Sequence, residues 1–258
     1  MRFASLGSGS KGNALVVEAR SSRVMLDCGF SVRDATQRLA RLGLSPSDLS
    51  ALVVTHEHSD HAGGAYAFAR RFSLPVWMTY GTWAAIRDQG ADAGYGAAVN
   101  LIENQPAFGV GDLSMQPISV PHDAREPVQF VFSDGDKRLG VLTDIGCSTL
   151  HVESALSGCD ALVIETNHEL EMLINGDYPP PLKARIAGRY GHLDNATSAA
   201  ILAALDRSRL QHVVAAHLSQ KNNTPELARA ALARVLGCAD EWVGVATQGE
   251  GFGWRVIA

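Results

Sequence analysis

The sequence lacks the features that direct a chain into or through a membrane. No apolar run approaches the roughly 20 residues that a membrane-spanning helix needs, and residues 1–4 contain no signal-peptide apolar core. The four cysteines have neither a pairing pattern nor metal-type spacing, which is typical of reduced thiols; they are Cys28, Cys147, Cys159 and Cys238. We therefore expect a soluble, cytoplasmic protein that does not bind a membrane.

The sequence also lacks an excess of positive charge. Its 22 lysines and arginines and its 27 aspartates and glutamates are spread along the chain and give a net charge of −5. Nucleic-acid binding would therefore need a local basic surface. The sequence contains no repeat, low-complexity block or linker-like stretch. With 258 residues, 46% of them hydrophobic, the chain can bury a large core, and we predict one domain over residues 1–258.

The most informative stretch is Thr55 to His61, which reads T-H-E-H-S-D-H. It follows the apolar run 51–54, which predicts a buried strand, and it precedes a predicted helix over 62–72. Imidazole nitrogens and carboxylate oxygens are ligands of zinc, manganese and iron. A helix cap would explain one oxygen acceptor but not three imidazoles. The stretch therefore predicts a metal site.

The glycine-rich segment 7–12 matches the dinucleotide-binding pattern G-x-G-x-x-G. That pattern must open a helix, whereas residues 13–19 continue as a β-branched strand. A hairpin explains the glycines better. A loop at the rim of the site that offers backbone amides to an anion remains an alternative.

The remaining pattern alternates strands and helices in two groups. Besides the elements above, strands are predicted at 2–6, 22–27, 75–78, 99–102, 113–119, 127–133, 138–143, 161–164, 210–215, 241–246 and 253–257. Helices are predicted at 31–42, 79–87, 148–157, 195–205 and 224–236, and the glycine-rich stretch 88–100 as a mobile loop. This order predicts sheets that pack together with helices outside.

One cluster cannot complete a metal site, so further ligands must come from later loops. His122, Asp144 and His217 each follow an apolar strand. Alone, such an aspartate is more often a turn residue and such a histidine more often structural. Their repeated placement at strand ends favours a shared site.

This order of motifs, H-x-H-x-D-H and then His, Asp and His, resembles the metallo-β-lactamase superfamily. The resemblance implies an α/β (α+β) fold, the four-layer αββα sandwich, which agrees with the predicted element order. It also implies two divalent metal ions, zinc or manganese, which the sequence does not distinguish. One ion would be held by His56, His58 and His122, and the other by Asp60, His61 and His217, with Asp144 as the bridge.

Looser motifs resemble the YycJ (WalJ) branch of that superfamily. They are the segments 6–13, 165–169, 191–195 and 217–226. Members of this branch are described as metal-dependent nucleases that act on DNA from the 5′ end. The interval between Asp144 and His217 is too short for the domain that some RNA-cleaving relatives insert there, so we expect no second domain.

The expected chemistry is hydrolysis by a hydroxide that two divalent ions generate from a shared water. Asp60 would orient that water or accept its proton. His192, which follows a basic segment, would protonate the leaving group; a surface histidine before a helix is the alternative. Glu57 is expected to support the site rather than bind metal, and His151 and His212 to be structural.

The residues expected to contact the substrate come from the branch motifs and the basic segment. For His168, with Asn167, a hydrogen bond that holds a ligand loop is an equal alternative. The set comprises Lys11, Asn13, Asn167, His168, Lys183, Arg185, Arg189 and Asn195, with Lys221 as a further candidate.

Three functions compete. The first is a phosphodiesterase that acts on nucleic acid, specifically a 5′→3′ DNA exonuclease, which requires a basic groove. The second is a hydrolase of a cyclic phosphodiester, thioester or lactam, which the acidic net charge favours. The third is a non-catalytic metal-stabilised binding module, which the complete ligand set disfavours.

Overall fold

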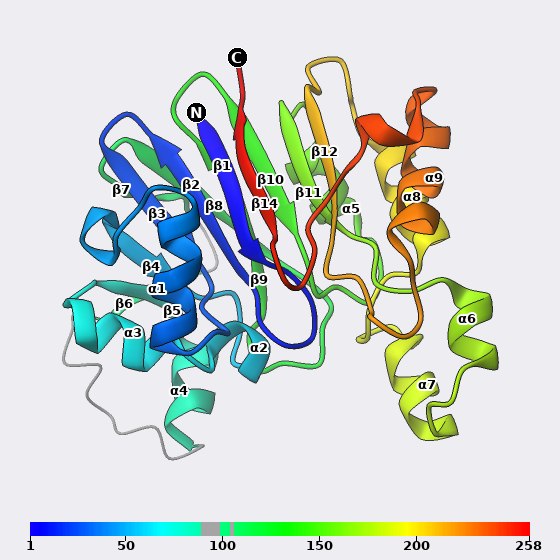
Figure 1. The fold of residues 1–258 in the computed structure, drawn as a ribbon, viewed down its shortest axis with the longest axis horizontal. Helices are drawn as coiled ribbons and strands as arrows, with labels where there is room; N and C mark the ends of the chain where they lie inside the picture. Colours follow the sequence, from blue (N-terminus) through cyan, green and yellow to red (C-terminus); the bar gives the residue numbers. More distant parts are fainter. Residues whose placement is uncertain (89–98, 104–105) are drawn as a thin grey trace.

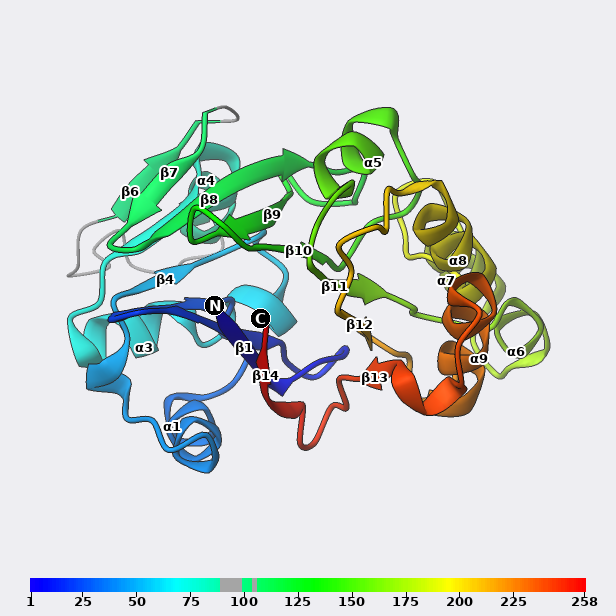
Figure 2. The same ribbon diagram turned by 90° about the horizontal axis from the view of Figure 1, so that it is seen from above.

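The computed structural model describes residues 1–88, 99–103 and 106–258. The predicted loop 88–100 lies almost wholly outside the described residues. Two sheets face each other, and helices cover their outer faces (Figures 1 and 2). Together with the solved structures compared below, this layering confirms the predicted four-layer αββα sandwich.

The first sheet contains the N-terminal strands and one strand from the other end of the chain. Its order is β14 (Phe252–Val256), β1 (Arg2–Gly7), β2 (Ala14–Ala19), β3 (Ser22–Leu26), β4 (Ala51–Val53), β5 (Val76–Thr79) and β6 (Val99–Ile102). Strands β3 to β6 run parallel, whereas β14, β1, β2 and β3 pair antiparallel. Residues 8–13 connect the antiparallel strands β1 and β2, as the hairpin interpretation predicts.

The second sheet, like the first, has seven strands in the described part of the chain. Its order is β13 (Gly244–Val245), β12 (His212–Ala216), β11 (Ala161–Glu165), β10 (Arg138–Leu142), β9 (Val128–Ser133), β8 (Leu113–Ser119) and β7 (Phe108–Val110). Strands β10 to β13 are parallel. Because the carboxyl ends of parallel strands share one edge, β10, β11 and β12 all deliver their following loops to the same place.

Three buried clusters correspond to the layers. Apolar side chains between the sheets, such as Phe3, Phe130 and Phe132, form the central cluster. The outer face of the first sheet packs against α1 (Val32–Arg41), α3 (Ala65–Phe72) and α4 (Tyr80–Asp88). The outer face of the second sheet packs against α5 (Leu150–Leu156), α8 (Asn195–Ala204) and α9 (Pro225–Leu236). The remaining helices are α2 (Ser59–Ala62), α6 (Leu170–Asn175) and α7 (Pro180–Ile186).

The predicted helix over 62–72 is wrong in detail. The structure has the short helix α2 and then α3, with Gly63 and Gly64 between them. A Cβ atom on Gly64 would lie 1.8 Å from the carbonyl oxygen of Phe30. Only glycine permits this approach, and the chain therefore turns there. As a result, Asp60 and His61 lie on a helical turn rather than in an extended loop. In the described part of the chain, every helix is too short or too polar to pass through a bilayer.

Candidate metal centre

The seven predicted metal ligands come together from four loops. His56, His58, Asp60 and His61 follow β4 of the first sheet. His122 follows β8, Asp144 follows β10 and His217 follows β12, all in the second sheet. The ligand atoms form two groups, each with its members within 4.8 Å of one another: His56 with His58 and His122, and Asp60 with His61, Asp144 and His217. The centre therefore lies between the two halves of the sandwich.

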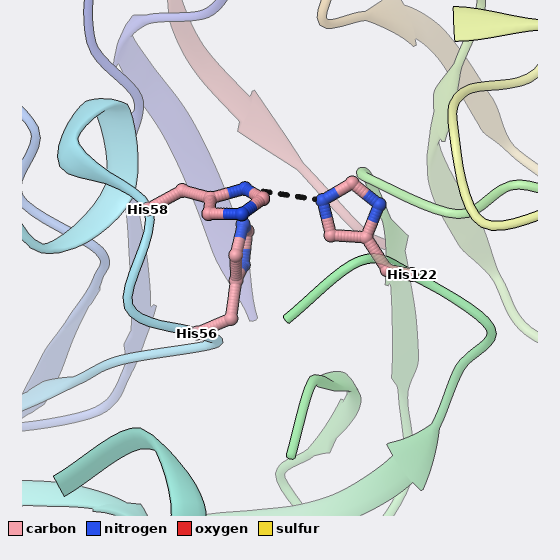
Figure 3. A group of neighbouring side chains, drawn as sticks. All are labelled: His56, His58 and His122. Carbon is pink, nitrogen blue, oxygen red and sulfur yellow. Dashed lines mark hydrogen bonds between the residues drawn. The ribbon is translucent and has the colours of Figure 1, made fainter. Parts of the chain in front are cut away.

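In the first group, one imidazole nitrogen of His58 lies next to one of His122. His122 Nδ1 lies 3.1 Å from the carbonyl oxygen of Gly191, and His58 Nε2 lies 3.2 Å from that of Asp123. A carbonyl accepts only, so these nitrogens carry N–H groups. The other two nitrogens, His58 Nδ1 and His122 Nε2, are 3.2 Å apart and are the ones left for a metal ion (Figure 3). Burial lowers the pKa of His122, which favours the neutral ring that a metal ligand requires.

His56, the third member of this group, also has one ring nitrogen in a hydrogen bond and the other free for a metal ion among the described residues. Thr55 Oγ1 lies 3.0 Å from Asp27 Oδ2, an acceptor, and therefore donates its only proton there. His56 Nδ1, 2.9 Å from Thr55 Oγ1, must then donate to the hydroxyl. Its Nε2 atom is buried and has no hydrogen-bond partner among the described residues. Burial, with His61 nearby, holds the pKa of His56 well below its usual range. One nitrogen of each of His56, His58 and His122 thus lies in one group, which fits a divalent metal ion.

The second group carries a concentration of negative charge. Burial alone would raise the pKa of Asp60, but the hydrogen bond with His217 and the charge of His61 lower it to about 2. Burial alone would lower the pKa of His217, but Asp144, Asp60 and Glu165 raise it to about 10. Ionised carboxylates in a buried site require positive charge, which protonated His217 supplies in the protein alone. A divalent ion that displaces this proton would supply the charge instead.

Asp144 contacts both groups. Its Oδ2 atom lies 2.8 Å from His61 Nε2 in the second group, and its Oδ1 atom lies 3.9 Å from His122 Nε2 in the first. This is the position that a bridging ligand requires. The side chain is 2% exposed, so bulk water does not compete for its oxygens.

Three residues of the site have left-handed backbone conformations. Asp27, Asp144 and His217 have φ angles of 61°, 53° and 55°, and each directly follows or lies within two residues of a strand end. Non-glycine residues seldom adopt such angles, which cost about 1–3 kcal/mol each. The sharp turns bring these side chains over the strand ends, and the surrounding packing compensates for the strain.

Glu165 supports the site, a role that the sequence analysis did not assign. It is the last residue of β11 and is fully buried. Its Oε1 atom lies 2.8 Å from His192 Nδ1 and 3.2 Å from His217 Nδ1. Its Oε2 atom accepts from the backbone N–H groups of Ile145 and Leu193 at 3.1 and 3.2 Å. The carboxylate groups spatially with Asp144, His192 and His217, but both its oxygens are engaged by N–H donors. We therefore assign it a positioning role.

Asp27 is a second supporting residue that the sequence analysis missed. It follows β3, and its Oδ1 atom accepts from the backbone N–H of Thr55 at 2.8 Å. Its Oδ2 atom lies 2.8 Å from His61 Nδ1. A carboxylate behind a ligating imidazole fixes the ring and its tautomer. The available signal was an acidic residue at the end of the strand next to the motif strand.

His192 lines the cavity beside the ligands. Burial by itself would lower the pKa of His192, but the adjacent carboxylate of Glu165 raises it. Because Nδ1 is bound to Glu165, Nε2 is the nitrogen left for a substrate. The cavity has a volume of about 390 Å³ and is also lined by Ser10, Asp123, Tyr178, Leu182 and Arg185.

Several predicted substrate residues lie beneath the site. Asn13 Nδ2 is 3.0 Å from His61 Nε2 and 3.3 Å from Asp60 Oδ2. Asn167 Nδ2 donates to the backbone carbonyl of His217 at 2.9 Å. Asn195 is 2% exposed and His168 is 1% exposed. The contact of Asn167 agrees with the alternative given for it and His168, in which they hold a ligand loop, and the substrate contacts of all four residues stay predictions.

The predicted basic residues, unlike these buried residues, lie nearer the surface of the protein. Lys11 and Arg189 are exposed, and Lys183 Nζ donates to the carbonyl of Ile174 at 2.6 Å. Arg185 alone of the four lines the cavity. Outside this set, Glu57 Oε1 accepts from the backbone N–H of Arg125 at 2.7 Å, which agrees with its predicted supporting role.

Comparison with known proteins agrees with this geometry. The family model described as the metallo-beta-lactamase superfamily matches residues 7–177. The chain belongs to the metallo-β-lactamase superfamily. This confirms the resemblance that the motif order suggested.

Two relatives within the superfamily match nearly the whole chain. Exodeoxyribonuclease YycJ of Bacillus anthracis is 34% identical over 247 residues, which cover 92% of this chain and 89% of the relative. Exodeoxyribonuclease WalJ of Streptococcus pneumoniae serotype 2 is 32% identical over 245 residues, which cover 95% of this chain and 91% of the relative. The YycJ/WalJ resemblance is therefore confirmed as well.

Solved structures of the superfamily share the fold at lower identity. Zn²⁺-bound PqqB from Methylobacterium extorquens superposes with a TM-score of 0.72 at 19% identity and covers 99% of this chain and 100% of that chain. YhfI from Bacillus subtilis superposes with a TM-score of 0.74 at 14% identity and covers 99% of both chains. These likenesses support the fold alone.

Proposed function

We propose that this metallo-β-lactamase-fold protein is a metal-dependent phosphodiesterase that removes nucleotides from DNA in the 5′→3′ direction. The observation that carries the proposal is the arrangement of two ligand groups, joined by Asp144, at a cavity that His192 also lines. The near full-length relationship to exodeoxyribonucleases YycJ and WalJ supports the substrate class.

Two divalent ions would be held by His56, His58 and His122 on one side and by Asp60, His61 and His217 on the other, with Asp144 shared. When bound, such ions lower the pKa of the attacking water and offset charge on the phosphate. Zinc and manganese both suit this imidazole and carboxylate set.

The protein's own residues would orient and move protons. Asp60 is held by Asn13 and His217, 3.3 Å from each, so its carboxylate is fixed where it can orient the water and accept its proton. His192, held at Nδ1 by Glu165, would deliver a proton from Nε2 to the leaving oxygen. Asp60 and His192 are thus the proposed catalytic residues.

DNA binding would use local basic residues, because the net charge of −5 provides no general attraction. We propose that phosphates meet Arg185, which lines the cavity, and beyond the cavity Lys11, Lys183, Arg189 and Lys221. Binding should then weaken steeply with salt. The buried residues Asn13, Asn167, His168 and Asn195 would affect the substrate through the loops they hold.

A hydrolase of a small phosphodiester is the second candidate. A cavity of about 390 Å³ falls within the range of about 300–1,000 Å³ that is typical of small-ligand pockets. This observation favours a compact substrate or one nucleotide of a strand end.

The test is a metal-defined assay of the purified protein. Substrates are end-labelled 5′-phosphorylated duplex DNA, single-stranded DNA and RNA, and bis-nitrophenyl phosphate. We expect metal-dependent release of nucleotides from the 5′ end of DNA. Turnover of small phosphodiesters or lactams with no cleavage of DNA would overturn the proposal.

Variants locate the chemistry. Asp60→Ala should abolish turnover, and His192→Ala should lower it by about 10²–10⁴-fold while both metals stay bound. His151→Ala, at an exposed histidine of α5, is the matched control and should behave as wild type. Full activity of His192→Ala would remove this residue from the mechanism.

A further inference from the structure

The two helices α6 and α7 carry apolar side chains that do not belong to the buried core. α7 contains no buried residue, and none of its side chains joins the three core clusters among the described residues. Figure 1 shows α7 beyond the strand ends, at the end of the molecule where α2 lies. An apolar surface outside the core requires another explanation.

Side chains of α7, and Tyr178 just before it, line the cavity beside the ligand groups. Tyr178, Leu182 and Ile186 all line it, together with His58, Asp144 and His192. The spacing of four residues from Leu182 to Ile186 places both on one face of α7, and Tyr178 precedes the first residue of the helix by two positions. The cavity lining therefore combines polar ligand groups with one aromatic and two aliphatic side chains.

We propose that Tyr178 and Leu182 form the contact surface for the base of a nucleotide that flanks the scissile phosphodiester. The inference rests on the proposed nuclease function and names a specificity determinant of the same site. A base has an apolar face that stacks on aromatic and aliphatic side chains, whereas a phosphate does not.

Charged groups beside this surface match the rest of a nucleotide. Lys221 Nζ lies over the Tyr178 ring, 5.3 Å from its centroid, which places a cation on one face of the ring and leaves the other face for a base. Arg185, on the same helix as Leu182, donates from Nε to Asp123 Oδ2 at 2.6 Å. This bond leaves the Nη edge of its guanidinium to meet a phosphate. Arg185 thus lines the cavity beside the apolar side chains, and Lys221 contacts the Tyr178 ring.

Helix α7 is fixed to the catalytic side of the cavity. The backbone N–H of His192 donates to the carbonyl of Ile186 at 2.8 Å, and Lys183 ties α7 to the end of α6. A base seated on Tyr178 would therefore hold a defined position relative to His192. Tyr178 and Leu182 would contact the face of the base and make no hydrogen bonds to its Watson–Crick edge. We therefore expect little preference among the four bases.

The experiment compares variants and an abasic substrate. Wild type, Tyr178→Phe, Tyr178→Ala and Leu182→Ala are assayed on single-stranded DNA and on the same strand with one abasic residue at either nucleotide that flanks the first scissile bond. Tyr80→Ala is the matched control, because Tyr80 is 61% exposed on α4 and does not line this cavity. Thermal melting and bound-metal content verify that each variant is folded and loaded.

We expect Tyr178→Ala to raise KM for DNA by about 5- to 100-fold, the range for removal of a base-stacking side chain. Leu182→Ala should give a smaller increase, and Tyr178→Phe and Tyr80→Ala should resemble wild type. At one flanking position, the abasic residue should raise the KM of wild type by the same factor. The same abasic residue should raise the KM of Tyr178→Ala little further.

Two results would overturn the inference while the proposed function stands. One is a wild-type KM that is unchanged by an abasic residue at either position. The other is a Tyr178→Ala substitution that raises KM, relative to wild type, by the same factor on intact and on abasic strands. If Tyr178→Ala does not fold, the wild-type comparison decides alone. Failure of wild type to cleave any DNA would instead refute the proposed function.

Discussion

His58 Nδ1 and His122 Nε2 lie 3.2 Å apart, and the opposite nitrogen of each ring donates to a backbone carbonyl. The unpartnered Nε2 of the buried His56 lies in the same group. A cation in this group would give the buried His56 nitrogen a partner and replace the contact between His58 and His122.

The first prediction concerns metal and stability. Zn²⁺ or Mn²⁺ at 100 times its dissociation constant should stabilise the protein by about 2.7 kcal/mol, which corresponds to roughly 5–10 °C in Tm for a chain of this size. Melting curves with and without chelator measure the shift. His122→Ala should reduce it, whereas His151→Ala should not. A Tm that is indifferent to both ions would contradict the assignment of this group.

The second prediction concerns Glu165. Its carboxylate accepts from two imidazoles and two backbone N–H groups, and glutamine at this position has a single oxygen to offer them. Glu165→Gln should weaken metal binding by about 10- to 100-fold and destabilise the fold by about 1–3 kcal/mol. Metal titration and urea unfolding test both effects. Glu153→Gln, on α5 away from the centre, serves as the control. Wild-type metal affinity in Glu165→Gln would show that the carboxylate does not position His217.

The third prediction separates the two ligand groups. Asp27 holds His61 through Nδ1, but it does not contact His58 or His122 directly among the described hydrogen bonds. Asp27→Asn should therefore weaken binding of the ion held by Asp60 and His61 by about 10- to 100-fold. It should weaken binding of the ion held by His58 and His122 less. After dialysis, elemental analysis should find close to one ion per chain. The exposed Asp136→Asn variant should retain the wild-type content. Equal loss of both ions would argue against independent roles.

The fourth prediction concerns pH and the first sheet. Arg2 and Arg23, on the strands either side of Glu18, both donate to its carboxylate. Burial alone would raise the pKa of Glu18, but the two arginines outweigh it and lower the pKa below its ordinary value of 4.5. A lowered folded-state pKa means that the stabilisation is present above pH 4.5 and is lost as the pH falls through the folded-state value.

Glu18→Gln should consequently be less stable than wild type by roughly 1–2 kcal/mol at pH 7, and the difference should shrink towards pH 3. Urea unfolding of both proteins at several pH values measures the difference. A gap that stays constant with pH would exclude the ion pairs as its cause.

Much of the centre was predictable because its residues carry local signals. His56, His58, Asp60 and His61 fall within six positions directly after an apolar strand. Asp144 and His217 also follow apolar strands, and those strands, β10 and β12, are parallel and end at one edge. Their repeated placement at strand ends favoured a shared site, and the resemblance to the metallo-β-lactamase superfamily supplied the ligand assignment.

The supporting residues were harder because their roles depend on neighbours distant in sequence. Glu165 ends β11, which lies between β10 and β12, and only this strand order shows that its carboxylate meets His217. Asn13 was predicted to bind substrate, yet the turn after β1 buries it against His61. Helix α6 is only six residues long, and no periodic pattern identifies so short an element.

The pairing of β14 with β1 has a consequence for biosynthesis. A nascent chain that has not yet released residues 252–256 leaves one border of β1 with unpaired main-chain N–H and C=O groups. Such a border recruits other strands and promotes aggregation. The first sheet, although most of its strands are translated early, therefore cannot be completed until residues 252–256 have left the ribosome.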